Sequence, residues 1–393
     1  MTTFWPERTF GEIFEITSSK RVLQKEWKKS GIPFYRAREI VRLARSGHVE
    51  NDLFISEAHY EKLKRDHGAP RPGDLMVSAV GTLGACYEVC QDDQFYFKDA
   101  SVLQFRPNED VDMGYIKHAF RTNAIQSQIH SGSGSTVGTY TISRAKETKI
   151  PLPPLPEQRR IAAILDKADE LRQKRRQAIE KLDELLQSVF LEMFGDPVTN
   201  PKGRVAKLSE VCEKITDGTH QSPKWSTSGV PFLFQSNVQP RIISFETKKF
   251  ISNETFVELT KRTPIEVGDV LYTIVGSYGN AAMVRESRDF CFQRHIAQLK
   301  PSLEVLPEYL EAAMNSRATK FQADNRVTGI AQKTLILREL RNIEIVVPSL
   351  QEQSKFKIIL KQIEGQIAAA KVAMLNSEYL FSSLQQRAFN GTL

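Results

Sequence analysis

The chain has 393 residues, 40% of which are hydrophobic, and a formal net charge of +7. This size predicts two or three folded domains, and the chain contains no apolar run of 18 residues or more, which excludes a transmembrane helix. The N-terminus has no basic region followed by an apolar secretory core, and the four cysteines show no Cys-x-x-Cys spacing, so we expect a cytoplasmic protein with reduced thiols.

The first part of the chain, residues 1–150, has a mixed α/β pattern. Short strand-like runs such as residues 73–80 alternate with polar helical stretches such as residues 56–65 and 114–130. Residues 131–139 predict a loop, because they hold too many glycines for the interior of a helix or strand.

A long helix is predicted in residues 151–197. Its proline-rich approach, residues 150–156, has the Pro-x-x-Pro spacing of an SH3 ligand, but an extended approach with Pro156 in the first helical turn accounts for the same residues. From Glu157 to Met193 the sequence contains no Gly or Pro, which predicts a helix of about 55 Å that ends at Gly195. A heptad-like seam is predicted at Ile161, Ile164, Ala168, Leu171, Arg175, Ala178, Leu182, Leu185 and Val189.

The second half of the chain repeats the first. Gly31-Ile32-Pro33-Phe34 returns as Gly229-Val230-Pro231-Phe232, and Gly73-Asp74-Leu75-Met76 returns as Gly268-Asp269-Val270-Leu271. A repeat of this length predicts two similar modules, each followed by its own long helix.

The repeat places a second α/β module at residues 198–347 and a second helix at residues 351–389. The second helix has a weaker seam at Phe356, Ile359, Ile363, Gln366, Ala370, Ala373, Ser377, Leu380 and Leu384. The two helices either lie separately on their own modules or pack on each other, and long seams favour the second arrangement. Since the first helix delivers the chain to the second module, the second helix must then run back antiparallel. We expect an antiparallel coiled coil with pseudo-two-fold symmetry, an arrangement suited to duplex DNA.

Sequence motifs for catalysis are missing. The sequence has no Gly-x-x-x-x-Gly-Lys-Ser/Thr loop for a nucleoside triphosphate, no glycine-rich turn for a dinucleotide or a methyl donor, and no Gly-x-Ser-x-Gly nucleophile turn. The seven histidines form no His-x-x-x-His pair and no cluster with cysteine, so no metal site is predicted. We expect a non-catalytic protein that binds no cofactor itself.

Two pairs of repeated loops suit contact with a polyanion, and +5 of the net +7 charge lies outside the two long helices. The turns Val80–Gly84 and Val275–Gly279 each follow a strand, where glycines let backbone amides approach a phosphate or form a plain hairpin. The loops 131–141 and 327–334 carry hydroxyl, amide and lysine side chains, and they are either phosphate and base contacts or flexible linkers.

A further set of polar residues differs between the two copies. Arg36 and Arg38 follow the first Gly-x-Pro-Phe turn, whereas Gln235 and Asn237 follow the second. Arginine pairs with guanine, and asparagine or glutamine pairs with adenine, so these differences suit two modules that read different sequences, unless they reflect neutral drift. The candidate DNA-binding residues are Arg36, Arg38, Ser78, Gly81, Thr82, Lys98, Thr136, Thr139, Tyr140, Gln235, Asn237, Ser277, Tyr278, Arg294, His295, Gln332 and Lys333.

The most specific motifs lie at the ends of the predicted helices. Residues 153–166 read PPLPEQRRIAAILD, residues 185–197 read LLQSVFLEMFGDP and residues 383–391 read SLQQRAFNG. With these motifs and the two Gly-Asp turns, nearly the whole chain resembles the specificity subunit of type I restriction–modification systems. The second copy departs from this pattern where Ser349 and Gln351 replace two prolines, so its docking surface need not be equivalent to the first.

The resemblance implies two target-recognition domains, residues 1–150 and 198–347, which each read half of a bipartite DNA site, and two helical spacers, residues 151–197 and 348–393. It also implies docking of two modification subunits, which bind S-adenosylmethionine and methylate adenine, and of restriction subunits that use ATP and Mg²⁺. The implied docking and spacer residues are Glu157, Gln158, Ile161, Ile164, Leu171, Leu182, Leu185, Glu352, Gln353, Ile359, Ile363, Leu380 and Leu384.

Three other interpretations remain open at this point. A type IIB-like restriction–modification enzyme uses a similar specificity subunit and differs mainly in its partners. A self-sufficient DNA methyltransferase would need a donor site that the sequence lacks. A non-specific coiled-coil DNA scaffold would show no sequence preference.

Overall fold

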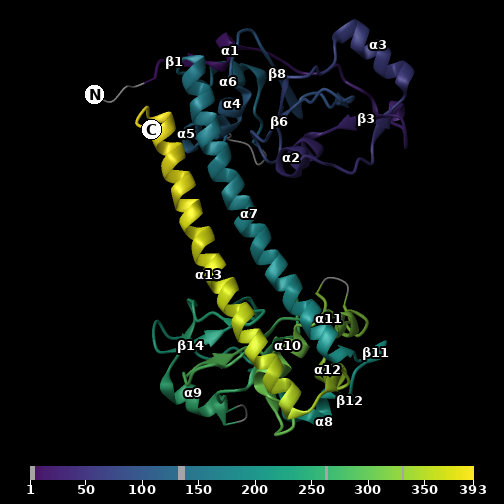
Figure 1. Ribbon diagram of the computed structural model, residues 1–393, viewed down its shortest axis with the longest axis vertical. Helices are drawn as coiled ribbons and strands as arrows, with labels where there is room; N and C mark the ends of the chain where they lie inside the picture. The colour runs from purple at the N-terminus through teal and green to yellow at the C-terminus, as the bar shows by residue number, and fades with distance from the viewer. Residues whose placement is uncertain (1–4, 132–137, 262–263, 330–331) are drawn as a thin grey trace. The chain divides into compact units, whose positions relative to one another are not determined.

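The structure is a computed structural model that describes residues 5–131, 138–261, 264–329 and 332–393. It divides into two compact units: unit 1 contains Met1–Arg176 and Ala373–Leu393, and unit 2 contains Gln177–Val372. The two long helices α7 (Leu155–Phe194, teal) and α13 (Leu350–Phe389, yellow) therefore each contribute one part to each unit (Figure 1).

In its described part, unit 1 is built on two main sheets. The first is antiparallel and has the order β2 (Phe14–Thr17), β8 (Val102–Pro107), β5 (Leu75–Ser78) and β6 (Cys86–Glu88). The second has the order β4 (Phe54–Ile55), β3 (Ile32–Tyr35) and β7 (Tyr96–Phe97), with β3 and β7 parallel. A separate pair, β1 (Glu7–Thr9) and β9 (Lys149–Pro151), joins the start of the unit to the segment before α7.

Short helices cover the sheets of unit 1. They are α1 (Phe10–Ile13), α2 (Ala37–Ser46), α3 (Glu57–His67), α4 (Met113–Phe120), α5 (Asn123–His130) and α6 (Ile142–Glu147), with a 3-10 turn, η1 (Gln24–Glu26), before β3. The rings of Phe10, Phe105 and Phe120 contact one another in the main core. The single helix predicted over 114–130 is wrong, because Thr122 accepts a hydrogen bond from the Ile125 amide and begins α5 as a new helix.

Unit 2 repeats this topology. Its main sheet has the order β13 (Cys212–Asp217), β21 (Ile296–Pro301), β18 (Val270–Thr273) and β19 (Ala281–Met283). Its second sheet has the order β17 (Phe250–Ile251), β14 (Val230–Leu233) and β20 (Cys291–Phe292), again with one parallel pair. β12 (Arg204–Lys207) pairs with β22 (Glu344–Val347) as β1 pairs with β9. The predicted internal repeat and mixed α/β fold are confirmed.

The helices of unit 2 also follow those of unit 1, with one local difference. They are α8 (Leu208–Val211), α9 (Asn253–Thr260), α10 (Pro307–Met314), α11 (Arg317–Asp324) and α12 (Leu337–Arg341). Where unit 1 has α2, unit 2 has the 3-10 turn η2 (Gln235–Asn237) and the short strands β15 (Val238–Gln239) and β16 (Ile242–Ile243). A small hairpin of β10 (Gly195–Asp196) and β11 (Asn200–Pro201) follows α7.

Both long helices have the predicted extent, within two residues at each end. Within unit 1, the Arg172 guanidinium of α7 lies 4.4 Å from the ring centroid of Phe381 of α13. Within unit 2, the rings of Phe190 and Phe194 of α7 each lie 5.4 Å from the ring of Phe356 of α13. In each unit, one part of α7 therefore packs on one part of α13.

The predicted seam of the helices is correct only in part, because Ile161, Phe356, Ile363 and Ser377 are buried but other seam positions are not. Leu171, Leu185 and Leu380 are 41%, 47% and 50% exposed, although the heptad pattern placed all three in the seam. The buried residues of the helices include Ile161, Leu165, Leu186, Phe190, Phe194, Phe356, Leu360, Ile363, Ile367 and Phe381. Each helix part also packs on the core of a module, and the large aromatic side chains in those cores decide which side is buried.

Candidate nucleic-acid interface

Unit 1 contains a hollow, here named the basic hollow, between α2 and the turn at Gly81. Its volume is about 540 Å³, and it is lined by Arg36, Ala37, Arg38, Val41, Arg42, Arg45, Val80, Gly81, Thr82, Lys98 and Ser101. Five of these described lining residues are cationic and none is acidic. A concave surface with charge of one sign suits an anionic partner.

The sequence of α2 explains how it forms one wall of the basic hollow. Ile40 and Leu43 are buried, whereas Arg38, Arg42 and Arg45, at positions i, i+4 and i+7, lie on the exposed side of the helix. The backbone amide of Arg36 donates to Glu39 Oε2 at 2.9 Å and so caps the helix start.

The Gly81 turn forms the opposite wall. Gly81 has φ +70°, and a Cβ built on it would meet no atom within 4 Å, so its backbone faces open space. The exposed Thr139 forms a β-bridge with Val80, which brings the loop before α6 beside this turn. The candidates Arg36, Arg38, Gly81, Thr82 and Lys98, from separate segments, line one hollow. Their contact with DNA stays a prediction.

Two carboxylates hold Arg36 and Arg38 in place. The buried Glu39 accepts from Arg36 Nη2 at 3.0 Å and from Arg38 Nε at 2.7 Å, and Asp52 accepts from Arg36 Nη2 at 2.7 Å and from Arg38 Nη2 at 3.0 Å. Burial alone would raise the pKa of Glu39, but hydrogen bonds from Arg36 and Arg38 outweigh burial and lower it. The hydrogen bond from Arg38 lowers the pKa of Asp52. Both carboxylates are therefore ionised at neutral pH.

Arg42 and Arg45 also line the basic hollow, although they are not among the residues predicted from the sequence. Both side chains are exposed, and neither forms an ion pair with another described residue. The sequence does contain the pattern that would have predicted them, because their spacing from Arg38 gives α2 one basic side. They extend the candidate set with two unpaired positive charges.

The corresponding turn of unit 2 gathers amides instead of guanidiniums. A Cβ built on Gly276 would lie 3.9 Å from Gln332 Nε2 and 4.0 Å from Gln235 Nε2, so two candidates from distant segments meet there. The Gly276 amide donates to the carbonyl of Lys333 at 2.9 Å, which places this exposed lysine beside the turn. Ser277, in the same turn, is also exposed.

The remaining candidates of unit 2 have mixed surroundings. The Tyr278 hydroxyl donates to Asp324 at 2.5 Å, and the Lys320 ammonium lies 3.5 Å from the Tyr278 ring centroid, so this side chain is held by neighbours. Arg294 is exposed. Burial, and then the nearby Arg294 charge, lower the pKa of His295, which is therefore neutral at pH 7.

Ser78 is corrected from a DNA-contact candidate to a structural residue. It is fully buried, its hydroxyl donates to the Thr82 carbonyl at 2.5 Å, and it accepts from the Ala85 amide at 2.9 Å. Thr273 makes the same two kinds of contact in unit 2. The hydroxyl at this position closes the glycine hairpin from inside and has no access to a ligand.

Tyr140 and Asn237 are corrected in the same way. Tyr140 is fully buried, and its hydroxyl lies 2.9 Å from Thr148 Oγ1. Asn237 is 6% exposed, accepts from the Phe234 amide and so caps η2, as Glu39 caps α2. Their polar atoms are satisfied within the fold. Thr136 lies outside the described residues.

Two of the predicted docking residues are buried glutamines that fasten the helix starts. Gln158 donates to the Pro153 carbonyl at 2.8 Å and accepts from the Asp112 amide at 3.0 Å. Gln353 donates to the Pro348 carbonyl at 2.9 Å and accepts from the Leu306 amide at 2.7 Å. These contacts correct the prediction that either side chain is open to a partner, and they fix each helix to the short helix α4 or α10.

The other docking candidates divide by burial. Ile161 and Ile363 are 0% and 5% exposed, which agrees with their predicted place in the helix seams and leaves neither side chain open to a docking partner. The exposed or partly exposed ones are Glu157, Ile164, Leu171, Leu182, Leu185, Glu352, Ile359, Leu380 and Leu384.

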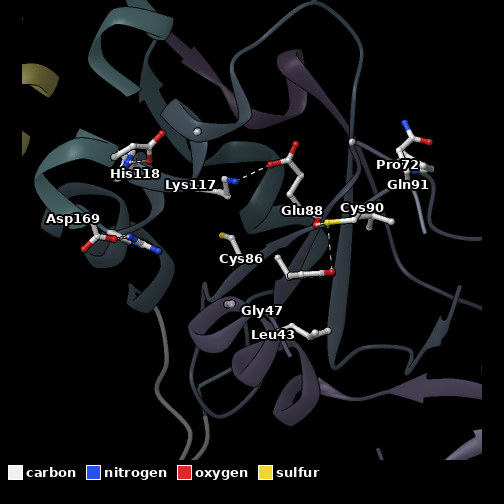
Figure 2. A pocket seen from close by; sticks show the side chains of 17 residues that line it. Leu43, Gly47, Pro72, Cys86, Glu88, Cys90, Gln91, Lys117, His118 and Asp169 are labelled. Carbon is white, nitrogen blue, oxygen red and sulfur yellow. Dashed lines mark hydrogen bonds and ion pairs between the residues drawn. The ribbon is translucent and has the colours of Figure 1, made fainter. Parts of the chain in front are cut away.

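A larger hollow of about 830 Å³ in unit 1 is bordered by β6, α4 and α7. Figure 2 shows Lys117 and Glu88 pointing toward one another, with Nζ and Oε2 2.7 Å apart. Arg121 donates to Asp169 at 3.0 Å, and His118 Nε2 lies 2.8 Å from an Asp166 oxygen. Three carboxylates but only Lys117 and Arg121 as cations are among the described residues that line this hollow, and both cations are paired, so it suits a polyanion less well than the basic hollow does.

Residues 5–131, 138–261, 264–329 and 332–393 contain no group of three or more His, Cys, Asp or Glu side chains placed to hold a metal ion. Across the same ranges, every helix is too short or too polar to cross a membrane.

Comparison with known proteins identifies the family. A family model described as the type I restriction modification DNA specificity domain matches residues 4–181 and 203–376. A putative type I restriction enzyme specificity subunit of Haemophilus influenzae is 28% identical over 163 residues, which cover 41% of this chain and 39% of that protein. The match thus spans less than half the length of that relative. The EcoBI specificity subunit of Escherichia coli is 22% identical over 434 residues, which cover 99% of this chain and 86% of that one.

Solved structures share the fold along the whole chain. A chain from a type I R-M system, solved for its complex assembly and conformational transition, has a TM-score of 0.60 at 20% identity and covers 100% of this chain and 99% of its own. The S subunit from M. genitalium has a TM-score of 0.53 at 16% identity and covers 98% of this chain and 96% of its own. The family model matches both modules, so the chain belongs to the type I restriction–modification DNA specificity family and serves DNA recognition in such a system.

Proposed function

We propose that this chain selects a bipartite, gapped DNA site, with residues 1–150 reading one half and residues 198–347 reading the other. The main support is that both modules place equivalent loops around a glycine turn but fill them with different side chains. The turn of unit 1 faces arginines, whereas the turn of unit 2 faces the amides of Gln235 and Gln332. Guanidinium and carboxamide groups pair with different bases, as two unlike half-sites require.

The contacts between α7 and α13 support a spacer role for these helices. In unit 1 the earlier part of α7 contacts the later part of α13, through Arg172 and Phe381 and through a hydrogen bond from Arg175 to Ser377. In unit 2 the later part of α7 contacts the earlier part of α13. Both observations favour an antiparallel coiled coil. A helix of 40 residues is about 60 Å long, which can accommodate half-sites about 34 Å apart on one DNA face.

Chemistry is assigned to partner subunits in this proposal. Two modification subunits would bind S-adenosylmethionine and methylate adenine, and restriction subunits would use ATP and Mg²⁺, while this chain would be non-catalytic. The exposed leucines Leu171, Leu185 and Leu380 are apolar surface available to such partners.

Long-read methylome sequencing tests the proposed function. Hosts carrying the modification subunit would be compared with this chain present, deleted, and restored from a plasmid. We expect a gapped N6-methyladenine motif that vanishes on deletion and returns on complementation. A motif that persists without the chain, or a contiguous motif in its presence, would contradict the proposal.

A further inference from the structure

We propose that α2 is the base-reading helix of the first module: Arg38 reads a guanine, Asp52 and Glu39 position Arg38, and Arg42 and Arg45 bind phosphates. This inference rests on the proposed function and adds a division of labour within the basic hollow. It also predicts that the first half-site contains an essential guanine.

The shape and charge of α2 suit the major groove of DNA. The helix spans ten residues, about 15 Å, and buries one side while its other side forms a wall of the basic hollow. The major groove is about 12 Å wide and admits one α-helix. The exposed side of α2 carries Arg38, Arg42 and Arg45, and Lys98 lies across the same hollow. No described residue that lines the hollow would repel phosphate.

The contacts of Arg38 orient its guanidinium for base reading. Its Nε donates to Glu39 and its Nη2 donates to Asp52, and neither hydrogen of Nη1 has a partner among the described residues. Its side chain is 48% exposed. A guanidinium held along one edge keeps donors free for the O6 and N7 acceptors of guanine, and it loses less conformational freedom on binding. Arg38 is therefore prepared to read one base.

Arg36 is paired through the same two nitrogens as Arg38, but its side chain is less accessible to a base. Its Nε donates to Glu39, and its Nη2 donates to both Glu39 and Asp52. Its side chain is only 28% exposed. Arg36 therefore helps to hold the two carboxylates that position Arg38.

Arg42 and Arg45 have the opposite character. They are exposed and form no ion pair with the described residues, so their long side chains can follow a phosphate backbone. Contacts of this kind add affinity on any sequence and release condensed counterions. The second module forms η2, β15 and β16 at this place, so we expect its reading to depend on Gln235 of η2 and Gln332 beside the glycine turn, and not on an α-helix.

The test measures how the full chain, with its modification subunits, binds duplexes that carry its own methylation motif. Affinity is measured by fluorescence anisotropy over a series of salt concentrations. The probes are the target duplex, the same duplex with 7-deazaguanine at each guanine of the first half-site in turn, and a duplex without the motif. The variants are Arg38→Ala, Arg38→Lys, Asp52→Asn, Arg42→Ala and Arg45→Ala, with Arg65→Ala of α3 as the matched surface control.

We expect Arg38→Ala and Arg38→Lys to weaken target binding by about 5- to 150-fold. At one particular position of the first half-site, replacing guanine with 7-deazaguanine should lower the affinity of the unsubstituted chain but not that of either Arg38 variant. Asp52→Asn should reduce discrimination between target and non-target DNA without lowering non-target affinity, because it removes a negative charge beside Arg38. Arg42→Ala and Arg45→Ala should each weaken binding to all duplexes alike and lower the slope of log affinity against log salt by about 0.9.

Two results would overturn the inference. One is an unchanged target affinity, or an equal loss on every 7-deazaguanine duplex, for both Arg38 variants when circular dichroism shows native folding. The other is an unchanged salt slope for both Arg42→Ala and Arg45→Ala. If the chain without substitutions bound the target duplex and the duplex without the motif equally well, the proposed function would be contradicted instead. The two failures are therefore distinguishable.

Discussion

The packing of α13 on unit 2 can be tested by replacing Phe356 with alanine. The Phe356 side chain is fully buried, and its ring contacts Phe190 and Phe194 at 5.4 Å and Tyr309 at 6.4 Å. Truncation removes the ring from an aromatic cluster that joins α7, α10 and α13. The loss combines the buried apolar area with the cavity that remains, because a close-packed core relaxes only in part.

We expect Phe356→Ala to lower the free energy of unfolding of unit 2 by about 4 kcal/mol. For a unit of 150–250 residues this corresponds to a decrease in Tm of roughly 8–16 °C. Trp225 is in unit 2, so its fluorescence reports on this unit when Trp5 and Trp27 are replaced by phenylalanine. Urea unfolding in that background gives the midpoint and the slope.

Ile358→Ala is the matched control, because Ile358 lies two residues further along α13 and is 61% exposed. It should change the free energy of unfolding by less than about 0.5 kcal/mol. Equal shifts of the urea midpoint in the two variants would refute the assignment of Phe356 to the core of unit 2. A change in the slope of unfolding free energy against urea concentration would indicate instead that the substitution alters the unfolded state.

Three further predictions test the pH response, the backbone and the spacer. Burial lowers the pKa of His118 despite its Asp166 contact. Below about pH 6.5 the unfolded chain therefore takes up a proton that the folded chain resists. The free energy of unfolding, measured by urea titration, should fall from pH 7.5 to pH 5.5, and it should fall less in His118→Gln. Gly229→Ala should destabilise unit 2, because φ is +123° and a Cβ would lie 2.5 Å from the Ile251 carbonyl oxygen, whereas Gly365→Ala, with open space around it inside α13, should stabilise by about 0.5–1 kcal/mol in thermal melts. Removing one heptad from α7, with a matching heptad from α13, should change the spacer length in the methylome motif and leave both half-sites unchanged; altered half-site bases with an unchanged spacer would disprove the spacer role.

Local sequence features were sufficient to predict the repeat and the long helices. The returning Gly-x-Pro-Phe and Gly-Asp turns predicted two modules of like topology, because equivalent glycines and strands at the same spacing lead to the same strand order. The absence of Gly and Pro between Glu157 and Met193 predicted a continuous helix, because backbone geometry within a helix depends on near neighbours. Helix motifs also carried the family resemblance.

Burial was not predictable from local features. Ser78, near the end of a strand-like run, and Tyr140, in a loop, look like exposed polar groups in sequence, yet hydrogen bonds to Thr82 and Thr148 hold them inside the fold. The heptad pattern placed Leu185 in the seam, whereas Leu186 is buried because Phe190 and Phe194 direct the next turns into the core. Which side of a helix is buried depends on partners from distant parts of the chain.

The sequence by itself determined the duplicated fold, the extent of the helices and the chemical contrast between Arg36–Arg38 and Gln235–Asn237. Only the tertiary structure decided that Arg38, Arg42, Arg45, Gly81 and Lys98 share one hollow, that Glu39 and Asp52 hold Arg38, and that Asn237 serves as a cap. The physical reason is how far apart in the sequence the contacting residues lie. Helices and turns follow from contacts a few residues apart, whereas a binding surface forms where residues distant in sequence meet and where polar groups without internal partners remain exposed.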